Sequence, residues 1–273
     1  MSMHPAEEWT AKAQLKRVTT EVRGGPMTHL EVGTGYPLVL LHGGGGTGKA
    51  FWYQLEGLSS HFRVLAPDLP GHGGSQWIEG VTTVDDMGPV LLEWMSALGL
   101  ERAVVGGNSM GGRVATAATL RRPDRVSHLV LIDAVAVLIE GLPPKNPLDI
   151  PPDRYLKELV HDPDHYRRTT PYRTLEDAEA LHRGRESFRR YMSASPLGPD
   201  RTEALPRLTM PLLLIWGRHD HIVPVEYGRV LATRVPTAEL TVIENAGHLP
   251  HIETPGIVNH LLLDFLERHP IPA

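Results

Sequence analysis

Short apolar segments alternate with helical patterns along most of this chain, and this alternation constrains the fold more than any other feature. Leu38 to Leu41 is a continuous apolar run that ends in glycines, as expected for a strand buried on both faces of a parallel sheet. Alternation of this kind predicts an α/β fold with a doubly wound, mostly parallel sheet, whose site lies at the carboxyl ends of the strands. Further strands are predicted near residues 63–66, 103–106, 128–132, 212–216 and 239–243, and helices near 49–58, 84–98, 111–120, 226–233 and 256–268.

Two parts of the chain depart from this alternation. Residues 14–22 and 27–32 alternate apolar and polar side chains around a glycine-proline turn, which predicts an N-terminal antiparallel hairpin at the sheet edge. Residues 136–206 are rich in proline and contain no convincing strand. Because an unstructured loop of that length is implausible in a compact domain, we expect a mainly helical cap there, inserted into a core domain of residues 1–135 and 207–273.

The segment Gly107–Gly111 joins a predicted strand to the next helix and matches the pattern G-x-S-x-G. In that pattern a strained turn exposes the hydroxyl of the serine, here Ser109, and glycine fits where the strand and the helix approach each other. The serine also lies at a helix N-terminus, which favours the negative charge that forms when a carbonyl is attacked. Taken alone, the segment is equally compatible with a purely structural turn.

Asp220 and His248 each follow the end of a predicted strand, so all three polar residues lie at the same edge of the predicted sheet. A neutral serine is a poor nucleophile. An imidazole must therefore accept its proton, and a buried carboxylate must orient that imidazole. We predict Ser109 as the nucleophile, His248 as the base and Asp220 as the orienting acid. Asp133 also ends a strand and is a second candidate for the acid.

A glycine-rich loop, His42–Gly46, follows the first buried strand. Serine hydrolysis needs N–H donors aimed at the oxyanion, and glycines let the backbone approach the substrate closely. The backbone amides of Gly44 and Met110 are the predicted donors, and Gly43 and Gly45 are predicted to lie against the substrate. His42 is expected to brace this loop by hydrogen bonding.

Together these motifs resemble the α/β-hydrolase superfamily over nearly the full length of the chain, which implies the fold of that name and no cofactor or metal. The segment Gly107–Gly112, with the His-Gly-Gly-Gly loop, is similar to the meta-cleavage-product hydrolases, which cut carbon–carbon bonds in dienoates from aromatic-ring degradation. Asn108 is the residue most suggestive of that branch. Its members carry a cap arginine that binds the substrate carboxylate; Arg185 matches that position, or else belongs to a solvated helix face. Gly46 and Leu249 depart from the branch, because many members have proline and tryptophan there.

Two other motifs point to different chemistry. Gly43–Lys49 nearly matches the phosphate-binding pattern G-x-x-x-x-G-K, but Ala50 stands where a serine or threonine should hold magnesium. The run His161–His165 resembles a metal site, but Asp-Pro turns on the cap surface explain it more simply, and no third cluster at ligand spacing supports it. We therefore predict neither a nucleotide nor a metal as ligand.

The composition excludes several classes of function. A formal net charge of -5 gives no surface for nucleic acid or an anionic membrane. The absence of cysteine excludes disulfides, zinc-thiolate sites and a cysteine nucleophile. The N-terminus lacks an apolar secretory segment, and the longest apolar run, residues 129–139, is too short for a membrane span, so a cytoplasmic protein is expected. The oligomeric state is left open, with a homodimer as one option.

The leading hypothesis is a serine hydrolase that cleaves a carboxylic ester or lactone of a small, largely apolar molecule through an acyl-enzyme. A carbon–carbon hydrolase of the meta-cleavage-product type is the alternative. A small-molecule receptor that keeps the scaffold without turnover is an alternative from another class. Apolar residues expected to line the pocket, although their type alone would equally place them in the core, are Trp52, Met87, Leu138, Phe188 and Leu249.

Overall fold

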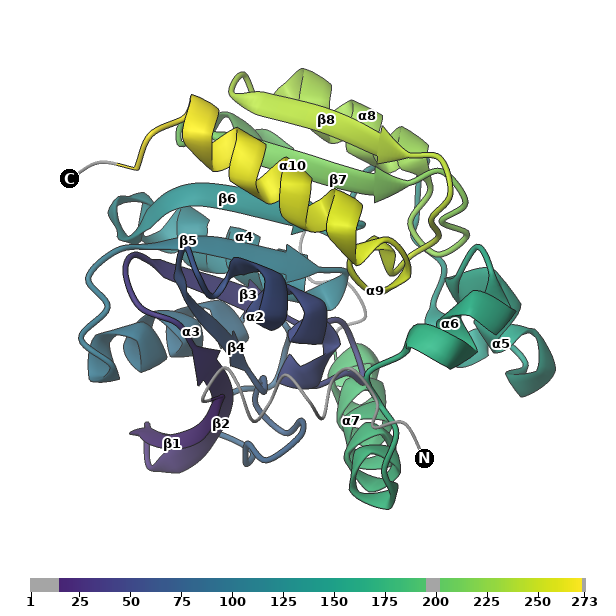
Figure 1. The fold of residues 1–273 in the computed structure, drawn as a ribbon, viewed down its shortest axis with the longest axis horizontal. Coiled ribbons are helices and arrows are strands. Elements are labelled where there is room, and N and C mark those ends of the chain that lie inside the picture. The colour runs from purple at the N-terminus through teal and green to yellow at the C-terminus, as the bar shows by residue number, and fades with distance from the viewer. Residues whose placement is uncertain (1–14, 195–201, 272–273) are drawn as a thin grey trace.

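An eight-stranded sheet forms the centre of the molecule, in the order β1-β2-β4-β3-β5-β6-β7-β8 (Figure 1). The computed structural model describes residues 15–194 and 202–271 of the chain, so Gln14 of the predicted hairpin and residues 195–201 of the predicted cap lie outside the described residues. The strands are β1 (Lys16–Val22), β2 (Gly25–Val32), β3 (Pro37–Leu41), β4 (Arg63–Pro67), β5 (Ala103–Asn108), β6 (Val126–Ile132), β7 (Leu212–Gly217) and β8 (Ala238–Ile243).

The pairing of the strands confirms both the hairpin and the mostly parallel sheet. β1 pairs antiparallel with β2, from Lys16 opposite Glu31 to Val22 opposite Gly25, and β2 pairs antiparallel with β4. The pairings from β4–β3 through to β7–β8 are all parallel. Parallel pairing brings the carboxyl ends of β3, β5, β6, β7 and β8 to one edge, where the loops that follow them meet.

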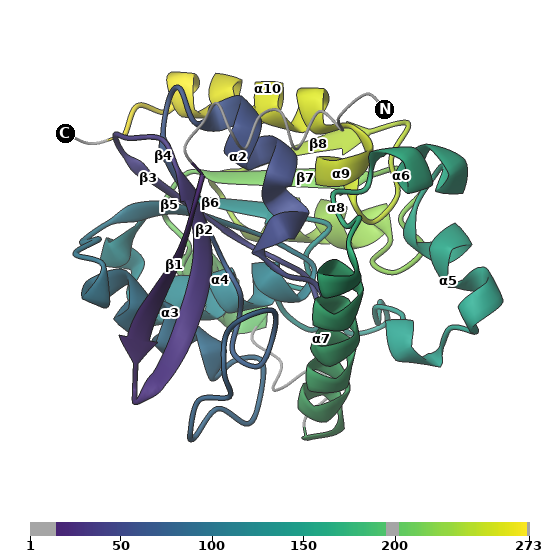
Figure 2. The same cartoon turned by 60° about the horizontal axis from the view of Figure 1, so that its bottom comes forward.

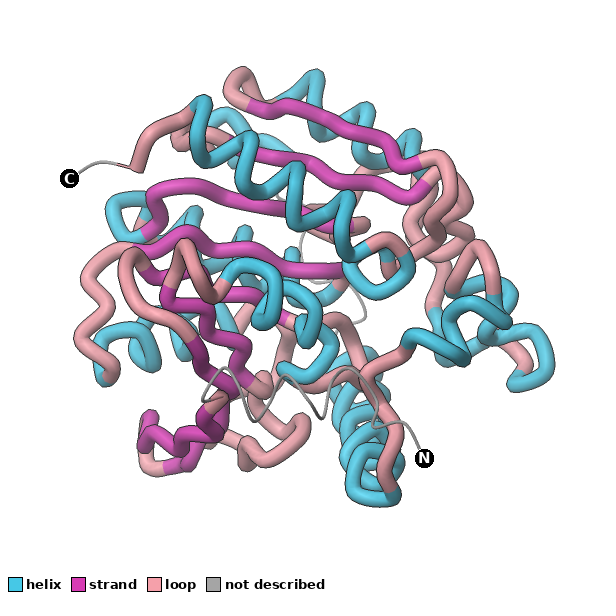
Figure 3. Tube along the Cα trace, in the orientation of Figure 1, coloured by secondary structure: helices cyan, strands magenta, loops and turns pink. Residues whose placement is uncertain are grey.

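Helices cover both faces of the sheet, as the alternating pattern predicts (Figures 1 and 3). Leu38 and Leu40 of β3 belong to the apolar cluster on one face, and Val39 and Leu41 belong to the cluster on the other. A strand buried on both sides explains why the apolar run is continuous. The helices are α2 (Trp52–Leu58) and α10 (Pro255–Arg268) on the first face, and α3 (Met87–Ala97), α4 (Met110–Arg121) and α8 (Val225–Arg234) on the second.

The segment between β6 and β7 is a mainly helical insertion, as predicted, and it lies beside the end of the sheet to which β7 and β8 point (Figures 1 and 2). Polar contacts join it to the core. The Lys49 ammonium donates to the Asp177 carboxylate at 2.9 Å, and the Tyr191 hydroxyl donates to the Pro70 carbonyl at 3.2 Å. The boundaries at residues 136 and 206 stay predictions. The helices of this cap are α5 (Pro152–Leu159), α6 (Pro163–Thr169) and α7 (Leu175–Ala194).

The cap helices are rich in charged residues. α7 is 20 residues long and begins with Glu176 and Asp177 in its first turn. Within the described part of the chain, no helix combines the length and the apolar character needed to cross a membrane. The cytoplasmic location and the oligomeric state stay predictions.

Candidate active site

Ser109 lies at the turn between β5 and α4, where the sequence predicts a strained strand-to-helix turn. Its backbone has φ 54° and ψ -118°, a region that residues other than glycine rarely adopt. The flanking glycines are required by space. A Cβ at Gly107 would lie 2.3 Å from the Gly111 carbonyl carbon, and one at Gly111 would lie 2.1 Å from the Leu41 carbonyl oxygen. The turn therefore holds Ser109 at the carboxyl edge of the sheet.

Asp220 and His248 form a buried hydrogen-bonded pair. The Nδ1 of His248 lies 2.8 Å from Oδ2 of Asp220, and their residues are 3% and 5% exposed. The other carboxylate oxygen of Asp220 accepts the backbone N–H groups of Ile222 and Val223 at 2.7 and 2.9 Å. Of the two predicted candidates for the acid, Asp220 is thus the one in contact with the imidazole. These bonds hold the carboxylate in place. Because the carboxylate contacts Nδ1, Nε2 is the nitrogen of His248 that is left to face the cavity.

Ser109 and His248 both line one cavity, although no hydrogen bond between their side chains is found among the described residues. Such contacts are often long without substrate and shorten in the reacting complex. The three residues predicted as a triad are therefore brought together by the fold. Their catalytic roles stay predictions.

Glu253 was not singled out from the sequence, yet it supports the loop that carries His248. It is the last residue of α9 (Pro250–Glu253), and it is 5% exposed. One of its carboxylate oxygens accepts the N–H of Gly247 at 2.9 Å, and the other accepts the N–H of His161 in the cap at 2.7 Å. Burial raises the pKa of Glu253, while these N–H donors lower it. The sequence around Glu253 carries no signal that distinguishes a buried acid with this role from an ordinary acid on the surface of a short helix.

The glycine-rich loop precedes a short 3₁₀ helix, Gly48–Phe51, and lies directly against Ser109 and the cap. A Cβ on Gly43 would be 3.2 Å from the Cβ of Ser109, and one on Gly44 would be 2.5 Å from the ring of Phe188. His42 braces this loop as predicted, because its ring contacts the Gly43 carbonyl at 2.8 Å and accepts the Leu69 N–H at 2.9 Å.

The predicted oxyanion donors are the backbone N–H groups of Gly44, in the glycine-rich loop, and Met110, at the start of α4. Met110 is the first residue of α4, so its N–H has no acceptor within the helix. Among the described residues, no backbone carbonyl takes up the N–H of Gly44. Both amides are thus available to an oxyanion formed at Ser109, and their role stays a prediction.

Asn108 is 1% exposed and ties three segments together. Its amide nitrogen donates to the carbonyl of Ile132 at 3.1 Å and to the carbonyl of His248 at 3.0 Å. Both amide hydrogens are therefore used by the backbone, and only its oxygen is left for a ligand. Asn108 lines the cavity, but its clear contacts position the loops of the site.

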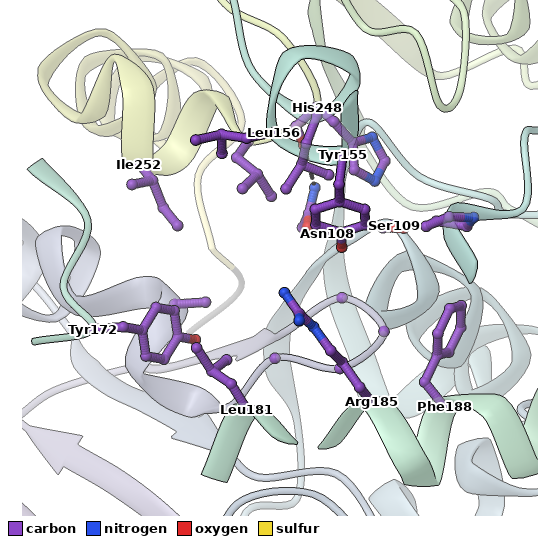
Figure 4. Close-up of a pocket in the computed structure, with 18 of the residues that line it drawn as sticks. Asn108, Ser109, Tyr155, Leu156, Tyr172, Leu181, Arg185, Phe188, His248 and Ile252 are labelled. Atoms are coloured by element: carbon purple, nitrogen blue, oxygen red, sulfur yellow. Dashed lines mark hydrogen bonds between the residues drawn. The ribbon is translucent and has the colours of Figure 1, made fainter. Parts of the chain in front are cut away.

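The cavity that Ser109 and His248 line has a volume of about 330 Å³ and lies between the glycine-rich loop, the His248 loop and the cap. Figure 4 shows Arg185 pointing from α7 into this space toward Tyr155, with Phe188 beside it. The guanidinium carbon of Arg185 is 5.3 Å from the centre of the Tyr155 ring. Besides the glycines, Ser109 and His248, the residues that line the cavity include Arg185, Phe188, Leu249, Leu156, Leu181, Ile252, Tyr155, Tyr166 and Tyr172.

Three residues predicted to line the pocket lie elsewhere, which corrects the expectation for Trp52, Met87 and Leu138. Met87 is fully buried in the core at the start of α3. Trp52 begins α2, and Lys49 covers its ring at 5.9 Å. The carbonyl of Leu138 accepts a hydrogen bond of 2.8 Å from the hydroxyl of Thr202, which lies on the connection back to β7. The sequence does not fix how the cap helices rotate relative to the core, so the cap tyrosines could not be found from it.

Ser109 also lines a second, smaller cavity of about 120 Å³. Its wall is mostly apolar. The two cations that line it have partners: Arg113 pairs with Asp85 at 2.8 Å, and Lys145 pairs with Glu158 at 2.6 Å. Ser109 therefore lines both a larger cavity that contains Arg185 and a smaller one of apolar character, whose lining includes Val84, Met110, Val135, Phe188, Met192 and Ile222.

The motifs that suggested other ligands have structural roles here. Lys49, the last residue of the P-loop-like run, faces Asp177 of the cap at 2.9 Å. Asp162 of the His161–His165 run caps the N-terminus of α6, because its carboxylate accepts the N–H groups of Asp164 and His165 at 2.9 Å. These contacts give both motifs a structural role, and the expectation of neither a nucleotide nor a metal stays a prediction.

Comparisons with known proteins agree with this geometry. The sequence model of the alpha/beta hydrolase family matches residues 38–261. A 2-hydroxy-6-oxononadienedioate/2-hydroxy-6-oxononatrienedioate hydrolase of Paraburkholderia phymatum is 33% identical over 248 residues, covering 84% of this chain and 86% of that protein.

Two solved structures are similar over almost their whole length. An esterase from Thermogutta terrifontis is 29% identical with a TM-score of 0.75, covering 93% of this chain and 98% of that one. A meta-cleavage product hydrolase from Pseudomonas fluorescens IP01 is 25% identical, also with a TM-score of 0.75, covering 92% and 98%. Both kinds of hydrolase are thus found among the similar proteins.

Proposed function

The chain belongs to the alpha/beta hydrolase family, and from that premise we propose that it hydrolyses the carbon–carbon bond beside the ketone of a 2-hydroxy-6-oxo-dienoate. This reverses the order of the hypotheses drawn from the sequence, which placed an ester or lactone first. The similarity to the dienedioate hydrolase of Paraburkholderia phymatum supports the change. The reaction would consume one water and release a hydroxydienoate and a second carboxylic acid.

The single observation that carries the proposal is the position of Arg185. Its guanidinium lines the same cavity as Ser109 and lies against the Tyr155 ring. Among the described residues, no carboxylate forms an ion pair with it, whereas other arginines of the molecule, such as Arg113 and Arg218, have such partners. A planar guanidinium without an acidic partner, facing a cavity, fits a substrate carboxylate.

The two cavities give the substrate a direction. Ser109 Oγ would attack the ketone carbon between them while His248 accepts the hydroxyl proton, and the amides of Gly44 and Met110 would receive the oxyanion. The carboxylate arm would lie in the larger cavity against Arg185. The acyl arm would lie in the smaller one, and we expect it to be mainly apolar, because the cations there already have acidic partners.

Before the bond breaks, the dienol must change to its keto form: the 2-hydroxyl loses a proton and C5 gains one. Cleavage of the C5–C6 bond then leaves its electron pair on C5, and conjugation through C3 and C4 carries this charge to the oxygen beside the carboxylate, which the proposal places near Arg185. His248 would return the proton taken from Ser109 to this dienolate oxygen, and water would then release the acyl group from Ser109. The same groups would cleave an ester if the leaving atom were oxygen.

Ester hydrolysis is the second candidate function. It is favoured by the similarity to the Thermogutta terrifontis esterase and by the apolar wall of the smaller cavity. In that case Arg185 would have no charge to bind in a neutral ester. The two functions therefore make opposite predictions for Arg185.

Replacing Arg185 by alanine should lower kcat/KM for a dienoate by about 10- to 100-fold, because a charge-assisted hydrogen bond contributes about 1.5–3 kcal/mol. Activity toward p-nitrophenyl acetate should change by less than about twofold, because that ester has no carboxylate. Initial rates with both substrates check this. Arg189→Ala, an exposed change on the same helix, is the matched control. An equal loss on both substrates would show that Arg185 only supports the cap.

A further inference from the structure

Asp133 is a fully buried acid at the end of β6, between the strands that carry Ser109 and Asp220. Its backbone has φ 45°, a left-handed conformation that aspartate tolerates better than most residues. The N–H of Gly217 donates to its Oδ1 at 2.9 Å. No N–H or hydroxyl of the described residues donates to its Oδ2. Oδ2 of Asp133 is therefore left for a partner other than an N–H or a hydroxyl group.

The carboxyl group of Asp220 lies close to this oxygen-rich site. One oxygen of Asp133, one oxygen of Asp220 and a ring nitrogen of His248 all lie within 4.8 Å of one another. Two buried carboxylates so close together repel each other when both are ionised, and both then offer only acceptors. A proton on one of them removes the repulsion and lets that acid donate a hydrogen bond to the other.

The other hydrogen bonds decide which acid holds the proton. Asp220 accepts two backbone N–H groups and contacts the His248 ring, so its charged form has three partners. Asp133 accepts one N–H, from Gly217. Burial, and then the negative charge of Asp220, raises the pKa of Asp133 well above its ordinary value. Each of these favours Asp220 as the ionised member of the pair.

We propose that Asp133 is a neutral carboxylic acid that donates a hydrogen bond to Asp220, and is thereby a positioning residue for the carboxylate that orients His248. This rests on the proposed triad but not on the choice between ester and dienoate. The charged or titratable groups that face Asp133 are Asp220, His248 and, at longer range, Glu253. The site would thus carry one negative charge behind the imidazole rather than two.

Unfolding experiments test the protonation state without relying on activity. An acid that is neutral when folded but ionised when unfolded makes folding take up a proton, so stability falls as pH rises above the unfolded pKa of about 3.9. Asp133→Asn removes this proton uptake and keeps a donor and an acceptor in nearly the same shape. From pH 5 to pH 8, the unfolding constant of the wild type divided by that of the variant should rise, by up to about tenfold per pH unit. A ratio that stays constant would mean that Asp133 is ionised, and would overturn the proposal.

Kinetics test the positioning role. Asp133→Asn should retain kcat within about threefold, because its amide can donate to Asp220 as the carboxylic acid does. Asp133→Gly, which suits the left-handed backbone but removes the side chain, should lower kcat by about tenfold or more. The acidic limb of the kcat/KM profile should be unchanged in the Asn variant. A shift of that limb to lower pH by about one unit would show that a negative charge had been lost. If kcat falls as much in Asp133→Asn as in Asp133→Gly, the donor role is contradicted.

Discussion

Replacing Ser109 by alanine is expected to lower kcat by about 10³-fold or more, for the dienoate and for any ester that the enzyme turns over. The hydroxyl oxygen is the atom that would attack the carbonyl, and no other hydroxyl-bearing residue of the described chain lines both cavities. The change removes one oxygen, so the protein should fold as before. Steady-state kinetics together with urea unfolding would measure both effects.

A matched control is Ser193→Ala, an exposed position on α7 that does not line either cavity. It should leave kcat within about twofold. If the Ser109→Ala protein keeps its activity when wild-type enzyme is rigorously absent, the nucleophile has been misassigned and the proposed acyl-enzyme does not form.

Asp220→Asn should lower kcat by about 10³- to 10⁴-fold, the second large effect. The carboxylate accepts a hydrogen bond from Nδ1 of His248 at 2.8 Å, which leaves Nε2 unprotonated toward Ser109. An amide in its place can offer an N–H to the ring and so hold the wrong tautomer. The two backbone bonds of Asp220 Oδ1 can be kept by the amide oxygen, so folding should survive.

Asp124→Asn is the control, because Asp124 is an exposed acid paired with Arg122 on the surface. It should leave kcat unchanged within about twofold. The nearby carboxyl of Asp133 makes the comparison informative. A loss of less than about tenfold in Asp220→Asn would indicate that Asp133 can take over the imidazole, and that the chosen acid is wrong.

The sequence predicted the parts of this molecule that local pattern determines. The apolar run of β3, the glycines around Ser109 and the polar residues after β7 and β8 each follow from burial or from steric need at one place in the chain. Because parallel strands end at one edge, their loops had to meet there. The proximity of Ser109, Asp220 and His248 could therefore be predicted from the sequence.

The parts that the sequence did not predict depend on how distant segments pack. Glu253 and Asp133 have their contacts only when the loops after β6, β7 and β8 are assembled. The cap tyrosines line the cavity because of how α5 to α7 pack against the core, and no local pattern in the cap sequence predicts that packing. Trp52, Met87 and Leu138 were misplaced because an apolar residue type does not distinguish a core position from a pocket position.

The preference between ester and dienoate also lay beyond the sequence pattern, because both reactions use the same nucleophile, base and oxyanion donors. What differs is the group that binds the leaving fragment. The sequence left Arg185 as either the cap arginine of the branch or part of a solvated helix face, and the structure places it in the lining of the same cavity as Ser109.

The central claim is tested most directly by the kcat/KM of the purified wild-type protein for a 2-hydroxy-6-oxo-dienoate with an apolar acyl group, measured beside that for p-nitrophenyl acetate. Loss of the dienoate absorbance and release of p-nitrophenol follow the two reactions in the same buffer. We expect kcat/KM for the dienoate to exceed that for the ester by about 100-fold or more, with multiple turnovers. An ester preference of the same size, or no turnover of the dienoate, would contradict carbon–carbon hydrolysis.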